Sequence, residues 1–241
     1  MVRKPDYWDS SEGAIIRAIV LGGAFTKNEI IKKTGLTEEQ FEAARNESIK
    51  TGLLTEIDDN AKLWVNSRQL FKEYQEFFTE LQERIINFVC EWRIKKRLRG
   101  SLNHFFLDGE LLDELSRKLI KIAYLDVLVA NPYVDRCNLS RSLIKARENG
   151  TCVRLVTRHI ANQYNKERME KCHSELQQEG VSITYEDSIH AKLITIDRAV
   201  AIVSSMNFIA SSSGGAACEA GIVSVEPDVV LPVTNYILDQ L

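Results

Sequence analysis

The feature that most constrains this chain is a regular alternation of two patterns between residue 101 and residue 241. Short apolar runs of strand length are separated by longer segments in which apolar residues recur every three or four positions. The predicted strands cover residues 125–130, 152–156, 181–185, 191–196, 200–204 and 221–225, and the predicted helices cover residues 113–122, 139–148, 162–178 and 229–240. Strands separated by helices are typical of a layered α/β sheet, so the sequence predicts this fold class for residues 101–241.

Residues 1–66 follow a different order, with three helical patterns and then a short hairpin. Thr37 precedes the third helical pattern, and Gln40 three residues later completes a capping box at its start. Two short apolar segments flank the polar turn 58–60, which predicts the hairpin. This order of elements resembles a winged helix-turn-helix domain.

Residues 67–99 predict one long helix, because neither Gly nor Pro interrupts them and apolar residues form a seam. The seam consists of Leu70, Tyr74, Phe77, Leu81, Ile85, Phe88 and Trp92. Such a seam either pairs with its copy as a short coiled coil or packs on the next domain, and both readings stay open. We therefore expect a winged helix-turn-helix-like domain at 1–66, a long linker or dimerisation helix at 67–100 and an α/β domain at 101–241.

Composition excludes several classes of protein. Charged residues make up 27% of the chain, which argues against wholesale disorder. The longest apolar runs have the length of strands, which argues against a membrane span. The N-terminus becomes acidic at Asp6, where a signal peptide would become apolar, and the five cysteines contain no Cys-x-x-Cys pair. We expect a cytoplasmic protein that has no membrane partner.

One group of polar residues, at the ends of two predicted strands, carries the chemistry. His190 and Lys192 are two residues apart, so on a strand they would project from one face. Asp197 begins a polar turn, and the returning strand ends near Ser205 and Asn207. A hairpin around this turn would bring together an imidazole, an ammonium group, a hydroxyl and an amide. Such a set of groups suits the oxygens of a phosphate.

The spacing H-x-K-x4-D-x6-[GS]-S-x-N, which runs from His190 to Asn207, resembles the HKD signature of the phospholipase D superfamily. Ser204 stands where many members carry Gly. Glu219 occupies the position, about a dozen residues beyond the asparagine, at which the family often has an acidic residue. The resemblance covers roughly residues 105–241. The superfamily includes lipid-cleaving enzymes, cardiolipin and phosphatidylserine synthases, and metal-independent nucleases.

The resemblance implies a mechanism. His190 would attack phosphorus to give a phosphohistidine, while a second histidine would protonate the leaving oxygen and later activate water. Lys192 and Asn207 would hold the nonbridging oxygens. Ser205 would position the phosphate, and Glu219 would orient the imidazole and fix its tautomer. No metal or other cofactor is implied, because the lysine and the amide supply the charge stabilisation.

Other residues have weaker assignments. Asp197 belongs to the signature, but its predicted role is mainly structural, in organising the hairpin turn. Arg158 ends a predicted strand at the edge that should face the site, so Arg158 and Ser204 are candidate substrate contacts, and a solvated position is the alternative for Arg158. The remaining histidines lack the spacing of metal ligands, and surface or capping positions are predicted for all three: His104, His159 and His173.

The number of motifs bears on assembly. The active site of the superfamily needs two HKD motifs, and this chain has one. The resemblance therefore implies a homodimer in which His190 of each copy meets the other across a two-fold axis.

The distribution of charge bears on nucleic-acid binding. Acidic residues outnumber basic ones in 1–66 and in 101–241, which argues against broad nonspecific affinity for DNA. Base contacts through Gln40, Arg45 and Asn46 remain open, with docking to a protein partner as the alternative for this domain. The candidate nucleic-acid track, for which a solvated helix end is the alternative, consists of Arg93, Lys95, Lys96, Arg97 and Arg99.

Together these features predict a metal-independent phosphodiesterase that acts as a homodimer, with DNA or RNA as substrate. A nuclease is favoured over a lipid enzyme because the chain lacks an amphipathic membrane-binding stretch. One alternative is a DNA-binding transcription regulator whose phospholipase D-like domain only senses a ligand, as in TrmB-type sugar-responsive regulators. The other alternative is a phospholipase.

Overall fold

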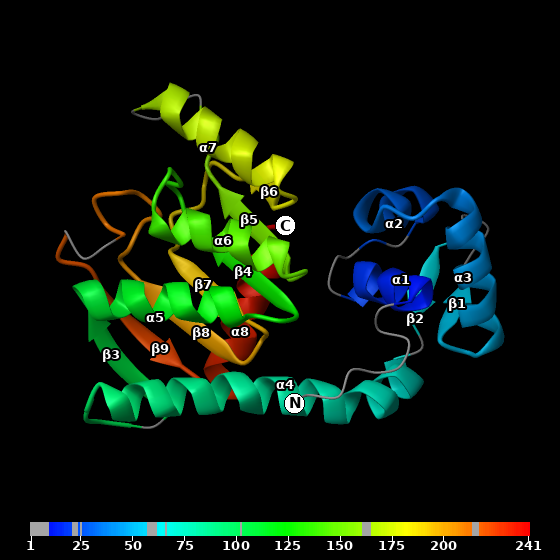
Figure 1. Cartoon of the computed structure of the whole chain (residues 1–241), viewed down its shortest axis with the longest axis horizontal. Coiled ribbons are helices and arrows are strands. Elements are labelled where there is room, and N and C mark those ends of the chain that lie inside the picture. The colour runs from blue at the N-terminus through cyan, green and yellow to red at the C-terminus, as the bar shows by residue number, and fades with distance from the viewer. Residues whose placement is uncertain are drawn as a thin grey trace. The chain divides into compact units, whose positions relative to one another are not determined.

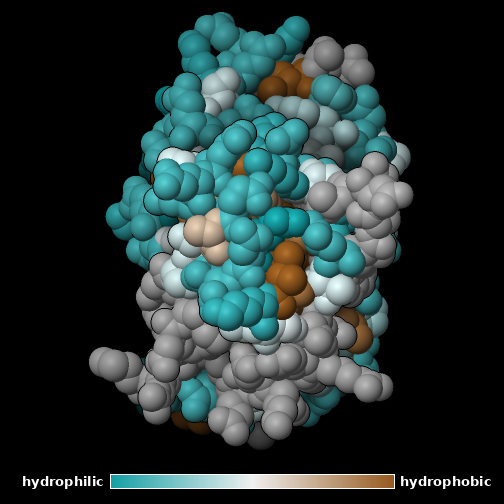
Figure 2. All heavy atoms as spheres, turned by 90° about the vertical axis from the view of Figure 1, so that its right-hand side faces the viewer, coloured by the Kyte–Doolittle hydropathy of each residue, from teal (hydrophilic) through white to brown (hydrophobic). Residues whose placement is uncertain are grey.

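The computed structural model describes residues 10–20, 24, 26–56, 62–65, 67–101, 103–160, 165–213 and 217–241 (Figure 1), without the side chains of residues 20, 64 and 67–78. The chain divides into two compact units, Met1–Leu81 and Gln82–Leu241. No helix among the described residues is long and apolar enough to cross a membrane. On the face drawn in Figure 2, the described residues are mostly hydrophilic, and apolar atoms occupy only small areas.

The first unit has the element order predicted for residues 1–66. Three helices, α1 (Ser11–Val20), α2 (Lys27–Thr34) and α3 (Glu38–Lys50), precede the antiparallel strands β1 (Leu54–Glu56) and β2 (Leu63–Val65). Thr37 caps α3 by accepting a hydrogen bond from the backbone N–H of Gln40. The core consists mainly of Ile15, Ile30, Phe41, Leu54 and Leu63, all fully buried. The assignment as a winged helix-turn-helix stays a prediction.

Helix α4 (Ser67–Lys95) is continuous over 29 residues. Its second half packs on the second unit, where Ile85, Val89 and Trp92 are buried in the hydrophobic core. The seam is therefore used inside the chain over this half. The side chains of Leu70, Tyr74 and Phe77 lie outside the described residues. The three-part division with boundaries at 66 and 100 stays a prediction.

The second unit is built on a seven-stranded mixed sheet, which confirms the predicted α/β class. The strands are β3 (His104–Asp108), β4 (Asp126–Ala130), β5 (Cys152–Thr157), β6 (Ser182–Tyr185), β7 (Leu193–Ile196), β8 (Val200–Ser204) and β9 (Ala220–Ser224). Their spatial order is β3-β9-β8-β7-β4-β5-β6. The strands β4, β5 and β6 are parallel, and the other neighbouring pairs are antiparallel. Strand β3 was missed by the sequence analysis.

Helices cover both faces of this sheet (Figure 1). The helices α5 (Gly109–Ile122) and α6 (Asn138–Glu148) lie on one face and, together with α4, enclose the larger core, which includes Val127, Val129 and Leu155. Helix α7 (Lys166–Gln178) packs beside α6 and against β6. Helix α8 (Pro227–Leu238) covers β4, β7 and β8 on the opposite face, where Ile237 packs with Leu128.

The turn between β7 and β8 is held by one buried carboxylate. Asp197 lies in the left-handed region at φ 50°, and its Oδ1 accepts hydrogen bonds from the backbone N–H groups of Tyr124, Leu125 and Asp126 at 3.0, 2.7 and 3.1 Å. These donors sit at the start of β4, so the carboxylate ties the hairpin to its neighbouring strand. Burial raises the pKa of Asp197 to about 7, against the opposing effect of the three N–H donors.

We predict that Asp197→Ala destabilises the protein by about 3 kcal/mol or more, because the buried N–H groups of Leu125 and Asp126 lose this acceptor and alanine is placed at a positive φ. Asp197→Asn keeps the acceptor oxygen and a residue that tolerates this backbone, so its cost is smaller. Urea unfolding followed by circular dichroism measures both. Equal costs for the two variants would contradict this role.

The Asp197→Asn variant also tests how the unfolding free energy depends on pH. The pKa of Asp197 is raised in the folded chain to about 7, whereas an unfolded aspartate has a pKa of about 3.9. The folded state therefore binds the proton more tightly, and this contribution to stability is fully present below pH ~4 and is lost as pH rises through about 7. We expect Asp197→Asn to flatten the fall in unfolding free energy over this range.

Candidate functional site

The residues of the HKD signature gather at one edge of the large sheet. They lie where β7 begins, where β8 ends and where β9 begins. The backbone N–H of Ser204 donates to the carbonyl of Lys192 at 3.1 Å, and that of Ser205 donates to the carbonyl of Ala220 at 2.9 Å. Because these three strands are antiparallel neighbours, their ends meet at this edge.

His190 and Lys192 precede β7 rather than lying on it. The strand begins at Leu193, although the sequence analysis began it at residue 191. The segment is still held in place, because Ile189 is buried in the core under α8 and the Lys192 carbonyl accepts from β8. His190 itself is exposed, so its imidazole is open to a molecule that approaches the sheet edge.

Two cationic side chains lie beside His190. The Nζ of Lys192 donates to the His190 carbonyl at 3.0 Å. The Nε of Arg158 donates to the Ile189 carbonyl at 2.7 Å, and its Nη1 donates to the Tyr133 hydroxyl at 3.3 Å. The pKa of Lys192 is lowered, first by its partial burial and then by the positive charge of Arg158, while Glu219 opposes this shift.

Ser205 and Glu219 form a hydrogen-bonded pair across the sheet edge. The Ser205 hydroxyl donates to Oε2 of Glu219 and accepts from the backbone N–H of Ala220 at 3.0 Å. The backbone carbonyl of Glu219 in turn accepts from the N–H of Gly109 at 2.8 Å, so α5 begins beside this pair. The positive end of the α5 dipole therefore lies at the same edge, which favours a bound anion.

The loop from Ser204 to Asn207 requires small residues and leaves one amide oxygen unused. A Cβ on Gly221 would lie 2.8 Å from the Cβ of Ser204, so a larger residue at either position would force the strands apart. The Ser204 hydroxyl accepts from the N–H of Met206 at 3.3 Å and so stabilises the loop. Oδ1 of Asn207 is buried and has no hydrogen-bond partner within the described part of the chain.

Asn131 supports this loop, and the sequence analysis did not identify it. Its Nδ2 donates to the Met206 carbonyl at 3.0 Å, and its Oδ1 accepts from the N–H groups of Phe208 and Tyr133, both at 3.3 Å. Asn131 is buried and directly follows β4. A polar residue immediately after a strand whose last four residues are apolar was the available signal.

Comparison with known proteins agrees with this geometry. A family described as "Cardiolipin synthase, PLD-like domain" matches residues 117–240, which is about half of the chain. The chain belongs to the PLD-like family. No curated protein matches it.

Three solved structures resemble the PLD-like chain. The phospholipase D family member Nuc from Salmonella typhimurium is 15% identical, covers 57% of this chain and 93% of its own, and has a TM-score of 0.51. NucT from Helicobacter pylori is 12% identical over 57% of this chain and 94% of its own, with a TM-score of 0.47. The archaeal chromatin protein TrmBL2 is 12% identical over 97% of this chain and 90% of its own, with a TM-score of 0.44. The likeness to Nuc shows that the two share the PLD-like fold.

Asp197, although part of the signature, lies at the other end of the PLD-like sheet. Asp197 is the fifth residue after Lys192 along a nearly extended chain, which corresponds to about 16 Å. The interpretation of Asp197 as a residue of the hairpin turn agrees with this position.

The predicted nucleic-acid track also lies away from the site. Arg93 is buried, donates to the Gly100 carbonyl and stands over the Phe105 ring, so it is not available to a ligand. Lys96 pairs with Glu114 at 2.7 Å. Lys95, Arg97 and Arg99 are exposed as well, so Arg93 is the one member of the cluster that is buried. A local run of basic residues did not reveal that helix packing turns Arg93 inward.

The prediction of a surface or capping position was wrong for His173. Its ring is buried, with Nε2 3.0 Å from the Val134 carbonyl and Nδ1 3.2 Å from the Tyr185 hydroxyl. Burial lowers the pKa of His173, which favours the neutral form of the ring. His104 and His159 are exposed, as expected.

The candidate base-contacting residues of the first unit are engaged within that unit. The Gln40 side chain accepts from the N–H of Thr37. Arg45 pairs with Glu42 and Glu56 and donates to Asn46 Oδ1 at 3.2 Å. These contacts would have to break before the side chains could read a base edge.

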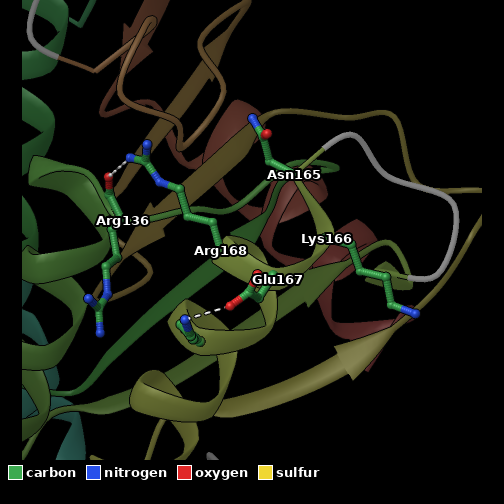
Figure 3. Close-up of a pocket in the computed structure, with 6 residues that line it drawn as sticks. Arg136, Asn165, Lys166, Glu167 and Arg168 are labelled. Carbon is green, nitrogen blue, oxygen red and sulfur yellow. Dashed lines mark hydrogen bonds and ion pairs between the residues drawn. The ribbon is translucent and has the colours of Figure 1, made fainter.

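A second candidate for an anion site is a cavity of ≈ 490 Å³ at the start of α7, which is lined by charged and polar residues (Figure 3). Its cations are already paired, since Arg168 contacts Asp135 at 2.7 Å and Lys171 contacts Glu167 at 2.8 Å. Arg136 pairs with Glu175. The cavity therefore offers little uncompensated positive charge. Among the described residues, no group of three or more His, Cys, Asp or Glu residues could hold a metal ion.

We predict that Asn131→Ala lowers the unfolding free energy by about 1–3 kcal/mol, because the Met206 carbonyl loses its hydrogen bond from the amide and the N–H groups of Phe208 and Tyr133 lose the amide oxygen as an acceptor. The matched control is Asn149→Ala, which removes one exposed hydrogen bond to the Lys121 carbonyl and should cost about 0.5 kcal/mol or less. Urea unfolding compares the two. An Asn131→Ala midpoint equal to that of the wild type would show that this amide does not support the loop.

Proposed function

We propose that the protein is a metal-independent phosphodiesterase, most simply a nuclease that hydrolyses DNA or RNA through a phosphohistidine intermediate. The observation that carries the proposal is the gathering of His190, Lys192, Ser205, Asn207 and Glu219 at one sheet edge. Membership of the PLD-like family supports phosphodiester chemistry at this edge.

The chemistry follows from the groups present. A ring nitrogen of His190 attacks phosphorus, an N–P bond forms, and the bond from phosphorus to the leaving oxygen breaks. A second imidazolium gives its proton to that oxygen and then takes a proton from water, whose oxygen displaces His190. Lys192 and the amide of Asn207 stabilise the negative charge on the nonbridging oxygens.

Arg158 extends this cationic surface beyond a single phosphate. Its guanidinium stands over the Tyr133 ring at 5.8 Å and is anchored to the backbone next to His190. A chain of phosphodiesters presents phosphates on both sides of the cleaved bond, so a second cation beside the site favours nucleic acid over a lipid with one phosphate.

The second histidine of this proposal is supplied by a second copy of the chain. Among the described residues, the other histidines are at the far end of the sheet (His104), stacked on Tyr185 (His159) or buried (His173). A homodimer with one composite site supplies the missing group. For the first unit, docking to a protein is favoured over reading DNA, because its candidate base-contacting side chains are engaged.

We predict that the wild type cleaves labelled nucleic acid in excess EDTA and that His190→Ala lowers the rate by on the order of 10³-fold or more. Single- and double-stranded DNA and RNA are tested together. The control, His104→Ala, removes an exposed histidine from the other end of the sheet and should leave the rate unchanged. Sequence-specific binding without turnover would favour a ligand-sensing regulator instead, and release of lipid headgroups would favour a phospholipase.

A subunit-mixing experiment tests the composite site. If each site needs His190 from both copies, the activity of wild type mixed with inactive His190→Ala falls as the square of the wild-type fraction. An equal mixture after subunit exchange then retains about one quarter of the activity, whereas independent sites retain about one half. A linear dependence would refute the composite site.

A further inference from the structure

His173 of α7 is the one buried histidine among the described residues, and both of its ring nitrogens have partners. Nε2 lies 3.0 Å from the Val134 carbonyl, and Nδ1 lies 3.2 Å from the Tyr185 hydroxyl. A carbonyl oxygen only accepts hydrogen bonds, so Nε2 carries the proton. Because burial favours the neutral ring, Nδ1 is then an acceptor, and the Tyr185 hydroxyl donates to it. The two contacts therefore fix the tautomer of the ring.

The Val134 carbonyl belongs to a short segment that pairs with the loop of the site. Val134 forms an isolated parallel bridge with Phe208. The N–H of Phe208 donates to the Tyr133 carbonyl at 3.1 Å, and the Phe208 carbonyl accepts from the N–H of Asp135 at 2.7 Å. Phe208 directly follows Asn207, whose amide binds the phosphate in the proposed function. A movement of Val134 would therefore move Asn207 as well.

The same segment also holds Arg158. The guanidinium of Arg158 stands over the Tyr133 ring at 5.8 Å and donates to its hydroxyl at 3.3 Å. Tyr185, the other partner of His173, pairs in the sheet with Thr157, which directly precedes Arg158. His173 thus contacts residues that adjoin both Asn207 and Arg158.

We propose that His173 is a positioning residue, which acts through the hydrogen bond from its Nε2 to the Val134 carbonyl. The groups that it positions are Asn207 and Arg158, which this bond keeps directed at one phosphate. The inference rests on the proposed function, because that function assigns both groups to the phosphate. It adds to the site a residue of α7 that does not itself touch the substrate.

Filling space would not require a polar ring at this position. Met169 and Leu176, about one turn before and after His173 on α7, are apolar and buried. Burying an imidazole costs free energy of desolvation that an apolar side chain of similar volume would avoid. An apolar side chain, however, could not donate a directed N–H to the Val134 carbonyl. The hydrogen bond, rather than volume, therefore accounts for a histidine here.

The test compares His173→Gln with His173→Asn. A glutamine amide reaches about as far as Nε2 and is able to donate to the Val134 carbonyl, whereas the shorter asparagine amide reaches only as far as Nδ1. We expect His173→Gln to keep kcat for labelled nucleic acid within about 3-fold of the wild type. His173→Asn should lower kcat by about 10- to 100-fold. KM should change less, because Lys192 still binds the phosphate of the ground state.

Thr151→Val is the matched control for stability. The Thr151 hydroxyl is buried and donates to the Ala123 carbonyl at 2.8 Å, so this variant also removes a side-chain donor from a backbone carbonyl. Thr151 precedes β5, at the end of the sheet opposite the site. Urea unfolding should show a loss of stability similar to that of His173→Asn, while kcat stays at the wild-type value. If kcat falls equally in both variants, His173 supports the fold and does not position the site.

Binding of inorganic phosphate, measured by calorimetry, separates this inference from the proposed function. If the wild type cleaves and His173→Asn cleaves equally fast, the positioning role is wrong and the proposed function stands. If the wild type cleaves no nucleic acid but binds phosphate, and His173→Asn weakens this binding while His173→Gln does not, the positioning role stands and the nuclease is wrong. A wild type that neither cleaves nor binds phosphate overturns both.

The tautomer gives a test that does not depend on whether the variants fold. In NMR spectra of the wild type with isotope-labelled histidine, we expect His173 to carry its proton on Nε2. A proton on Nδ1 would leave the Val134 carbonyl without its donor and would overturn the inference.

Discussion

The site depends on the register of the β7–β8 hairpin. Leu193 of β7 pairs with Val203 of β8. Lys192, which precedes Leu193, therefore meets Ser204, which follows Val203, at the sheet edge. A shift of one residue would turn every side chain of the strand to the other face. The buried carboxylate of Asp197 anchors the other end of the hairpin to β4 and so opposes such a shift. A residue about 16 Å from the chemistry therefore helps to define it.

Much of this arrangement could be predicted from local sequence. The alternation of strands and helices gave the fold class, and the polar turn between two apolar strands brought His190, Lys192 and Ser205 together. The rest depends on which distant strands become neighbours. Asn131 and Arg158 reach the site because β4 lies next to β7 in the sheet and β5 lies next to β4, an order that no local pattern encodes. For the same reason β3, which joins the sheet edge beside β9, was not predicted.

The prediction of an exposed basic cluster failed where side-chain packing determines whether a charged residue is exposed. Arg93 belongs to a basic run, yet the helix turns it onto Phe105 and the Gly100 carbonyl. Several other described cations are paired with carboxylates. Lys192 and Arg158 donate to backbone carbonyls beside His190, and these hydrogen bonds hold both side chains at the sheet edge. Composition alone does not reveal that placement.

A site shared between two copies has a consequence for how it selects its target. The two imidazoles of the proposed dimer are identical by symmetry, so either one is able to attack phosphorus while the other donates the proton. The leaving oxygen lies in line opposite the attacking nitrogen, and the polarity of the bound strand therefore decides which copy becomes the nucleophile. Features that break the symmetry of binding, such as contacts to Arg158 of one copy, would fix that choice. The proposed dimer has two N-terminal units for each composite site. A partner that binds these units would therefore have two points of attachment.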